Sequence, residues 1–287
     1  MSIRSNSARA GLPLRDPPGT FRIAAVQMAS GPKVDANLRE AERLVGVAAQ
    51  AGAKLVVMPE YFAIMGMKDA DKVAVREPFG RGDIQSFMAR VARKFRVWIA
   101  GAGIPLDCGR ADKVRNTCLL YDDRGELAAR YDKIHLFGLE MGEDRFNEER
   151  TIEPGDQVVV ADTPFGRLGL SICYDLRFPE LYRAMGNVDI ILVPSAFTET
   201  TGRAHWETLL RARAIENLAY VLAPAQGGYH VNGRETHGDS MVVDPWGVVL
   251  DRLQRGSGVV VASVDPAYRA KLRASLPALE HRTLRQV

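Results

Sequence analysis

Short apolar runs of strand length alternate along the first half of the chain with segments of helical periodicity. Residues 21–28 (FRIAAVQM), 54–60 (KLVVMPE) and 97–103 (VWIAGAG) are the apolar runs, and each is long enough for a buried strand. The segments between them carry apolar residues three or four positions apart, at Leu38, Ala41, Val45 and Ala48 and again at Ile84, Phe87, Met88, Val91 and Phe95. This alternation of strands and amphipathic helices predicts an α/β fold.

Residues that favour helix ends flank both of these segments. Asp35 or Asn37 can cap the first helix at its N-terminus, and Gly52 suits its C-terminal end. Asp83 can cap the second helix in the same way. The sequence therefore predicts where both helices begin.

Two hairpins interrupt the alternation, because turn residues there separate pairs of strand-like runs. The first has its turn at residues 122–125 (DDRG), and the second has its turn at residues 245–247 (PWG). Antiparallel neighbours are thus expected in addition to the parallel strands of an α/β fold.

The second half of the chain repeats the pattern. Long apolar runs indicate sheets that are covered on both faces. Two sheets packed together with helices outside, a four-layer α-β-β-α sandwich, would accommodate the helices and the hairpins. The further strands are expected at residues 167–173, 189–194, 219–225 and 258–264, and the further helices near Pro179 and at about residues 202–217.

Residues 1–20 differ from the rest of the chain. Residues 2–15 contain Arg and Ser but no acidic residue, which weakly resembles an organelle transit peptide. Pro17, Pro18 and Gly19 then break any helix, so a flexible N-terminal extension is the simpler interpretation. No repeat or linker follows, and residues 21–287 are expected to form a single domain.

Composition narrows the possible partners. The chain is 46% hydrophobic and 25% charged with a net charge of +3, and its Arg and Lys residues are scattered, so no nucleic-acid surface is indicated. The three cysteines lack C-x-x-C spacing, which argues against disulfides or a metal cage and fits reduced thiols in the cytoplasm. No apolar run reaches the roughly 18 residues that a membrane helix needs. A small-molecule partner is expected.

Cys173 stands where the apolar run 167–173 meets Tyr174 and the helix expected near Pro179. Such a strand-to-helix turn exposes a side chain and aims backbone N–H groups at one point, which is the geometry of a nucleophile. A cysteine at the end of a buried strand is also a common small core residue. Both interpretations remain open from this residue alone.

Three other residues suit proton transfer or charge stabilisation. Glu60 ends an apolar run, where its carboxyl group should be partly desolvated, although a solvated acid at a strand end is the alternative. Lys133 has apolar neighbours and suits an anionic partner, but a surface lysine is also possible. His135 could activate a thiol, since residues 133 and 135 would share one face of a strand.

The segments that contain these residues, VVMPEY, RYDKIHLF and SICYDLRFPELYR, together resemble the Glu-Lys-Cys signature of the nitrilase superfamily of carbon–nitrogen hydrolases. The resemblance runs from Phe21 to about Arg282. It implies the α-β-β-α fold, a nucleophilic Cys173, proton transfer by Glu60, and an oxyanion held by Lys133 and the backbone N–H of Tyr174. It also implies a structural role for His135.

The residues around the signature narrow the subgroup. Cys-Tyr-Asp in place of the Cys-Trp-Glu of nitrile-specific members resembles the amidase branch, most of all the deaminated glutathione amidases and next the ω-amidases. A second functional glutamate after the lysine matches Glu148, in the run Phe146-Asn147-Glu148. Glu143 is nearby and also acidic, so the choice between them stays open.

The resemblance implies a small amide substrate that bears a carboxylate, with no metal or organic cofactor and a homodimer or larger homo-oligomer. An ω-amidase, an N-carbamoyl amino acid hydrolase and a catalytically silent interaction protein are the alternatives. Tyr61, Phe197 and Thr198 are expected to line the pocket. A basic clamp for the carboxylate is expected from among Arg177, Arg203, Arg211 and Arg213.

Overall fold

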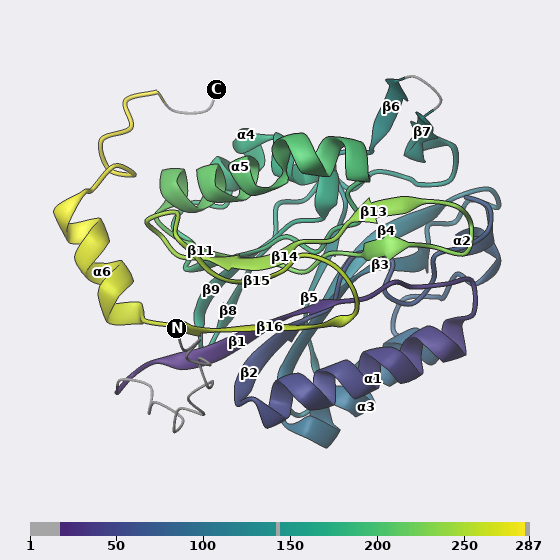
Figure 1. Ribbon diagram of the computed structural model, residues 1–287, viewed down its shortest axis with the longest axis horizontal. Helices are drawn as coiled ribbons and strands as arrows, with labels where there is room; N and C mark the ends of the chain where they lie inside the picture. Colours follow the sequence, from purple (N-terminus) through teal and green to yellow (C-terminus); the bar gives the residue numbers. More distant parts are fainter. Residues whose placement is uncertain (1–17, 142–143, 285–287) are drawn as a thin grey trace, which may run out of the picture.

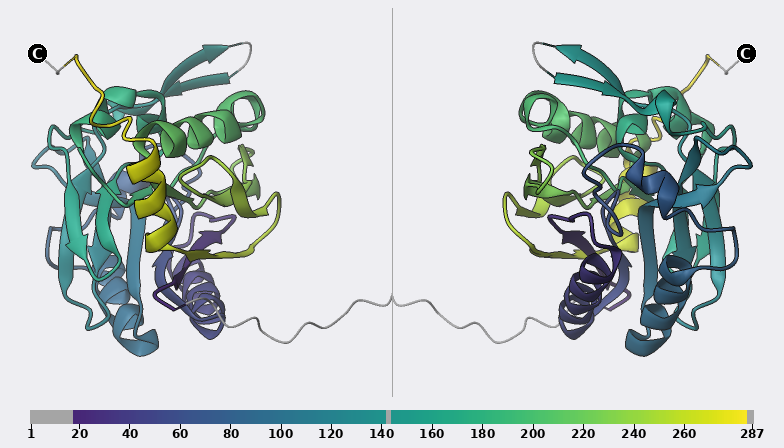
Figure 2. Two further views of the ribbon diagram at one scale, coloured as in Figure 1. Left: turned by 90° about the vertical axis from the view of Figure 1, so that its left-hand side faces the viewer. Right: turned by 90° about the vertical axis from the view of Figure 1, so that its right-hand side faces the viewer.

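Two six-stranded β-sheets lie face to face, and helices cover their outer faces (Figure 1). This computed structural model describes residues 18–141 and 144–284, so most of the expected N-terminal extension, residues 1–17, lies outside the described residues, as does Glu143. The predicted four-layer α-β-β-α sandwich is confirmed. The two side views show the same layers edge-on (Figure 2).

The first sheet combines parallel and antiparallel pairs. Its strands, in spatial order, are β16 (Gly258–Val264), β1 (Phe21–Gln27), β2 (Ala53–Val57), β3 (Trp98–Asp107), β4 (Val114–Tyr121) and β5 (Leu127–Asp132). The central strands β1, β2 and β3 are parallel, and β16, β4 and β5 pair antiparallel with their neighbours. The pair β4 and β5 is the first predicted hairpin.

The second sheet has a similar plan. Its strands, in spatial order, are β15 (Val249–Leu253), β14 (Ser240–Val243), β11 (Tyr220–Ala223), β10 (Ile190–Leu192), β9 (Gly166–Leu170) and β8 (Val160–Thr163). The parallel strands β9, β10 and β11 form its centre, and β14 with β15 forms the second predicted hairpin. Two short hairpins that the sequence did not indicate lie outside these sheets: β6 (Gly138–Met141) with β7 (Asp144–Asn147), and β12 (Gly227–Tyr229) with β13 (Glu235–His237).

Helices form the outer layers. α1 (Val34–Gln50) and α3 (Asp83–Phe95) cover the first sheet, and α4 (Pro179–Ala184) and α5 (Glu199–Asn217) cover the second (Figure 1). α6 (Pro266–Ser275) follows the last strand, and the short elements are α2 (Asp71–Ala74) and the 3₁₀ turns η1 (Glu148–Arg150) and η2 (Cys173–Arg177). No helix within the described ranges is long and apolar enough to cross a membrane.

The packing of the core explains why the sequences of the strands are unbroken apolar runs. In β1, Ile23 and Ala25 belong to the core between the two sheets, whereas Ala24 and Val26 pack in the core under α1 and α3. Both faces of the strand are therefore buried, and a fully buried Ile or Val side chain contributes roughly 1.5–3 kcal/mol to stability. On the other side, Trp206 of α5 packs against the second sheet.

The two predicted N-caps are wrong. Neither Asp35 nor Asn37 caps α1, and Asn37 is instead buried with its side chain bonded to the main chain of two loops. Asp83 lies inside α3, and the carboxylate of Glu77 accepts the Ile84 amide at 2.6 Å in its place. Glu77 precedes the helix in sequence, and the fold brings its carboxylate back to the N-terminus of α3. The predicted end of α1 is confirmed, with Gly52 at φ +87°.

The carboxyl ends of the central strands meet at one edge of the sandwich, where ligands bind in open α/β sheets. Isolated bridges join Met28 to Gln226 and Ser195 to Ala225 at this edge. The Gln226 amide nitrogen donates to the carbonyl oxygen of Glu60 at 3.0 Å, so the loops that follow β2 and β11 are held together. Residues that end different strands are thereby gathered in one place.

Candidate active site

Cys173 opens the turn η2 directly after β9, with φ at +50°. Positive φ is uncommon for a residue with a side chain and is typical of sharp turns that present a nucleophile. The Cys173 amide donates to the Pro194 carbonyl oxygen at 3.0 Å, and the Ala196 amide donates to the sulfur. The cysteine is therefore held in the strand-to-helix turn that the sequence indicates.

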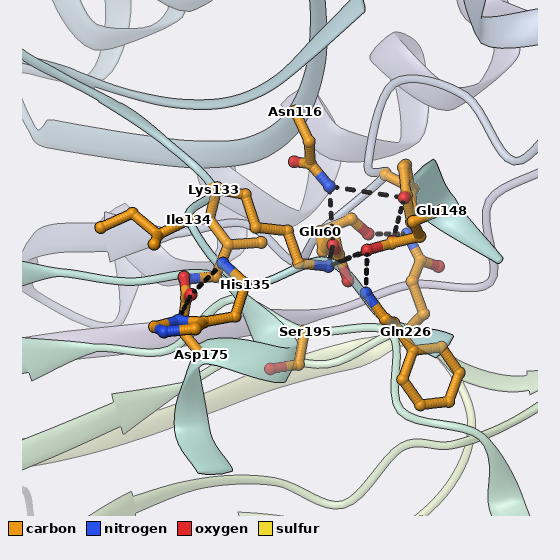
Figure 3. Close-up of polar contacts among 12 residues, drawn as sticks. Glu60, Asn116, Lys133, Ile134, His135, Glu148, Asp175, Ser195 and Gln226 are labelled. Atoms are coloured by element: carbon orange, nitrogen blue, oxygen red, sulfur yellow. Dashed lines mark hydrogen bonds and ion pairs between the residues drawn. The ribbon is translucent and has the colours of Figure 1, made fainter. Parts of the chain in front are cut away.

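Glu60 lies in the turn after β2 and is 1% exposed. Its Oε1 accepts hydrogen bonds from Asn116 Nδ2 at 2.8 Å and from Lys133 Nζ at 2.9 Å (Figure 3). The turn passes so close to β3 that a Cβ on Gly103 would lie 2.0 Å from the Tyr61 nitrogen, so only glycine fits there. This carboxyl group is desolvated, as the sequence suggested, but not isolated.

Lys133 is buried immediately after β5, with its ammonium between two carboxylates. Nζ is 2.9 Å from Glu60 Oε1 and 2.8 Å from Glu148 Oε2 (Figure 3). Burial by itself would lower the pKa of Lys133, but the charges of Glu148 and Glu60 outweigh it and raise that pKa well above its usual range. Lys133 is therefore a permanent cation and not a surface lysine.

Glu148 begins η1 and completes the group. Besides the Lys133 ammonium, its carboxylate accepts the Tyr61 hydroxyl at 2.7 Å and the Phe137 amide at 2.8 Å. Burial opposes ionisation, but the charge and hydrogen bond of Lys133 outweigh it and lower the pKa of Glu148. The structure thus brings Glu148 to Lys133.

Burial and the nearby charges together set the acidity of the Cys173 thiol. Burial raises the pKa of the Cys173 thiol well above its usual range, the charge of Glu60 adds to this increase, and Lys133 offsets only part of it. The two carboxylates of Glu60 and Glu148 and the one ammonium of Lys133 make a further negative charge on the sulfur unfavourable. The direction of this change favours the protonated thiol.

His135 belongs to a different network. Its Nδ1 is 2.7 Å from Asp175 Oδ1 (Figure 3). Its ring stacks on Phe178 with centroids 3.7 Å apart. β5 ends at Asp132, so residues 133 and 135 do not share the face of a strand as the sequence suggested. In the part of the chain that the structure describes, no hydrogen bond joins His135 to Cys173.

Asp175 holds the nucleophile turn to the lysine segment. Its Oδ1 accepts the His135 amide at 3.0 Å and the ring nitrogen, and its Oδ2 accepts the Tyr131 hydroxyl at 2.7 Å and the Ile172 amide at 2.9 Å. Ile172 directly precedes Cys173, and the other donors lie around Lys133. One buried carboxylate therefore fixes the position of both residues.

Asp175→Asn is expected to lower the free energy of unfolding by about 1–3 kcal/mol and to reduce turnover. Each carboxylate oxygen faces one main-chain N–H, so the new NH₂ group must point at a donor in either orientation. Urea unfolding measures the loss, with Asp112→Asn as a control because Asp112 is exposed. Wild-type unfolding of Asp175→Asn would contradict this bracing role.

A pocket of about 410 Å³ opens beside these residues, and its lining includes Glu60, Glu148 and Cys173. Of the residues expected to line it, Tyr61 and Thr198 do so. Phe197 and Arg177 line a smaller hollow next to it, which Cys173 and Tyr174 also border. The site is thus a cleft that combines buried charges at its base with polar side chains around it.

Three of the four arginines considered for the basic clamp make structural contacts outside the pocket lining. Arg203 pairs with Glu199 on the surface, and Arg211 bonds to the Gly247 carbonyl oxygen. The buried Arg213 donates to the Leu176 carbonyl oxygen and pairs with Glu216, so it supports η2. None of these three is in the pocket lining. Arg177 packs over the rings of Tyr174 and Phe197 at the neighbouring hollow.

The cations that do line the pocket are Lys72 of α2 and Arg234 of the β12–β13 hairpin. Sequence reasoning missed both, because neither stands in a motif or at the end of an apolar run. It also missed Asn116, for which a signal existed: a buried amide within a strand suggests a buried polar partner. Within the described ranges no three His, Cys, Asp or Glu side chains are grouped to hold a metal ion.

Comparisons with known proteins agree with this geometry. A family model described as carbon–nitrogen hydrolase matches residues 22–274. The chain is 42% identical over 268 residues to a protein of Synechocystis sp. named deaminated glutathione amidase, covering 91% of this chain and 98% of that protein.

Solved structures are similar over the same region. The crystal structure of the NitFhit protein of Caenorhabditis elegans has a TM-score of 0.84 and 38% identity, covering 92% of this chain and 65% of that longer chain. A glutamate-to-glutamine mutant of the amidase from Nesterenkonia sp., with the acetamide moiety of fluoroacetamide added covalently at its active-site cysteine, has a TM-score of 0.78 and 27% identity. It covers 93% of this chain and 95% of its own. The matched region contains every strand and turn that forms the pocket.

Proposed function

Because the chain belongs to the carbon–nitrogen hydrolase family, we propose that it cleaves its amide substrate with Cys173 as the nucleophile, Glu60 as the proton carrier and Lys133 as the stabiliser of the oxyanion. The observation that carries this proposal is the buried group in which Glu60 and Glu148 both contact Lys133 beside Cys173. The covalent adduct on the active-site cysteine of the Nesterenkonia amidase supports the assignment of the nucleophile. The chain is thus an amidase of the nitrilase superfamily, as the sequence resemblance predicted.

In the first half-reaction the Cys173 sulfur attacks the amide carbon while Glu60 accepts the thiol proton. The raised pKa of the thiol supports attack with proton removal in the same step over a thiolate formed in advance. The carbonyl π bond becomes an oxyanion, which the Lys133 ammonium and the Tyr174 backbone N–H hold. Each such donor is worth roughly 3 kcal/mol to the transition state.

The tetrahedral intermediate then collapses with loss of the amide nitrogen, which leaves as ammonia from a primary amide and as an amine from a secondary one. Glu60 gives its proton to the nitrogen as the C–N bond breaks, which leaves a thioester on Cys173. In the second half-reaction Glu60 takes a proton from water, the oxygen adds to the thioester carbon, and the proton returns to the sulfur as the carboxylic acid leaves. Glu60 ends each cycle ionised, and the reaction needs no metal or organic cofactor.

Glu148 keeps Lys133 in place and charged. Its two oxygens lie 2.8 and 3.1 Å from Nζ, and its own position is fixed by Tyr61 and Phe137. This contact leaves the lysine charged even when Glu60 is protonated midway through the cycle. A cation is therefore present to stabilise the oxyanion in both half-reactions.

For the substrate we propose a small amide that carries a carboxylate, with deaminated glutathione as the leading candidate. Support comes from the curated relatives of that name, which are 37–42% identical to this chain. Monoamides of oxo-dicarboxylates and N-carbamoyl amino acids are the alternatives. A hydrolysis screen of purified protein over deaminated glutathione, short ω-amides, carbamoyl amino acids and nitriles tests the proposal. It measures ammonia for every substrate except deaminated glutathione, whose secondary amide releases an amine that is measured instead.

The same screen tests a prediction about whether the protein hydrolyses amides or nitriles. Amides are expected to be hydrolysed and the matching nitriles to react poorly, because Cys173 is followed by Tyr174-Asp175 and not by the Trp-Glu of nitrile-specific members. Each amide is compared with the nitrile of the same acid at one concentration. Nitrile turnover equal to amide turnover would overturn the assignment to the amidase branch.

We also propose a cytoplasmic homodimer or larger homo-oligomer, in which residues 21–287 form the hydrolase domain. All three cysteines are free, which fits a reducing compartment. α6 has no buried residue in the single chain, which fits a helix that a second copy covers. Light scattering of the purified protein gives the assembled mass and tests this part of the proposal.

A further inference from the structure

Lys72 lines the pocket with an ammonium group whose hydrogen-bonding capacity is largely unused. Its Nζ has three donors, and its hydrogen bond is a long one of 3.4 Å to Thr151 Oγ1. Within residues 18–141 and 144–284 no carboxylate lies within 4.0 Å of it. The ammonium lies 5.3 Å from the centre of the Tyr61 ring. A half-buried ammonium that has no carboxylate in direct contact can accept an incoming anion as its partner.

The other charged groups around the pocket have partners already. Lys133 pairs with both carboxylates at the base of the pocket. Arg234 is 2.8 Å from Asp69, and the remaining acids are held by other cations: Glu199 by Arg203, His237 and Arg255, and Glu235 by Arg255. Lys72 is therefore the cation of the described lining that is free to meet an incoming anion.

Tyr61 links Lys72 to the reacting group. Its hydroxyl donates to Glu148 at 2.7 Å, while its ring lies beneath the Lys72 ammonium. Tyr61 also follows Glu60 directly and has φ at +59°, so its position is fixed by the same tight turn. One rigid aromatic side chain thus separates the site of amide cleavage from the unpaired ammonium.

We propose that Lys72 binds the carboxylate of the substrate and so selects amides whose acyl chain ends in an anion. This inference rests on the proposed function, because it assumes that the amide carbon lies at Cys173. The acyl chain would extend along Tyr61 from Cys173 to Lys72. A charge-assisted hydrogen bond from the ammonium to the carboxylate then makes the anionic substrate bind more tightly than a neutral substrate of equal length.

The test compares two amides that differ only at the end of the chain. Glutaramate carries a carboxylate where pentanamide carries a methyl group. Lys72→Met keeps the length of the side chain and removes its charge, and it is expected to lower kcat/KM for glutaramate by about 10- to 100-fold, mainly through KM. The value for pentanamide should stay within about twofold.

Two further variants serve as controls. Lys72→Arg keeps a cation and should retain a preference for glutaramate that Lys72→Met loses. Lys68→Met removes the same charge from an exposed residue of the same segment that does not line the pocket, so both amides should behave as in the wild type. An equal loss on both amides in Lys72→Met, or a wild-type preference for pentanamide, would overturn the inference.

Failure of the proposed function gives a different result. If the wild-type protein hydrolyses neither amide, binding of glutarate is measured by calorimetry on the wild-type and Lys72→Met proteins. Binding that only the wild type shows would support the carboxylate site without the proposed chemistry. Equal binding by both proteins, or binding by neither, would overturn the carboxylate site itself.

Discussion

Replacing Cys173 by alanine is expected to lower amide turnover by a factor on the order of 10⁴–10⁶, because no thioester can form without the sulfur. The site otherwise keeps Lys133 and its carboxylates, so the fold and substrate binding should remain. Steady-state ammonia release measures the loss, and circular dichroism checks the fold. Turnover that survives in a folded Cys173→Ala protein would end the proposal of a covalent mechanism.

The other two cysteines provide the matched controls. Cys118 is fully buried in the core and Cys108 is only partly exposed, and neither lines the pocket, so replacing either by alanine should leave turnover unchanged. Because Cys108 is partly exposed, alkylation is best followed in a Cys108→Ser protein. Iodoacetamide should then modify Cys173 alone and abolish activity in step with the modification.

Glu60→Gln is expected to lower turnover by about 10²–10⁴-fold, the usual contribution of a general acid–base group. Gln keeps the shape and an oxygen for the hydrogen bonds from Asn116 and Lys133, so the fold should be retained. Both half-reactions lose their proton carrier. Mass spectrometry during turnover should therefore detect a Cys173 thioester that forms slowly or persists.

The same variant should change the acidity of the nucleophile. The charge of Glu60 adds to the burial that raises the pKa of the Cys173 thiol, so removing it should lower that pKa. The pH at which alkylation of Cys173 begins is expected to fall in Glu60→Gln even though hydrolysis is lost. Such opposite changes distinguish loss of a base from general damage to the site.

Glu149→Gln is the control for Glu60→Gln, because Glu149 is an exposed acid in the same turn as Glu148. It should hydrolyse amides at the wild-type rate. If Glu60→Gln instead turned over at near the wild-type rate with its fold intact, another group would have to carry the proton. His135 and Glu148 would then be the leading candidates.

The sequence by itself determined the layers of this protein and, through its resemblance to a family, indicated the candidate residues of the site. Its strands are buried on both faces, as β1 shows with Ile23 and Ala25 on one side and Ala24 and Val26 on the other, so they read as continuous apolar runs. Glu60 and Cys173 stand directly after such runs. Local patterns left the roles of both residues open, and the resemblance of three separated segments to the nitrilase superfamily singled them out.

Only the tertiary structure decided the contacts between segments that are far apart in sequence. Asn116 bonds to Glu60 across 56 positions, Glu77 replaces the expected cap of α3, and Lys72 reaches the pocket from a helix of four residues. Periodicity reports which face of an element is buried, but not which distant side chain lies opposite. The raised pKa of the Cys173 thiol has the same origin, since it depends first on burial and then on the charges that folding brings around the sulfur.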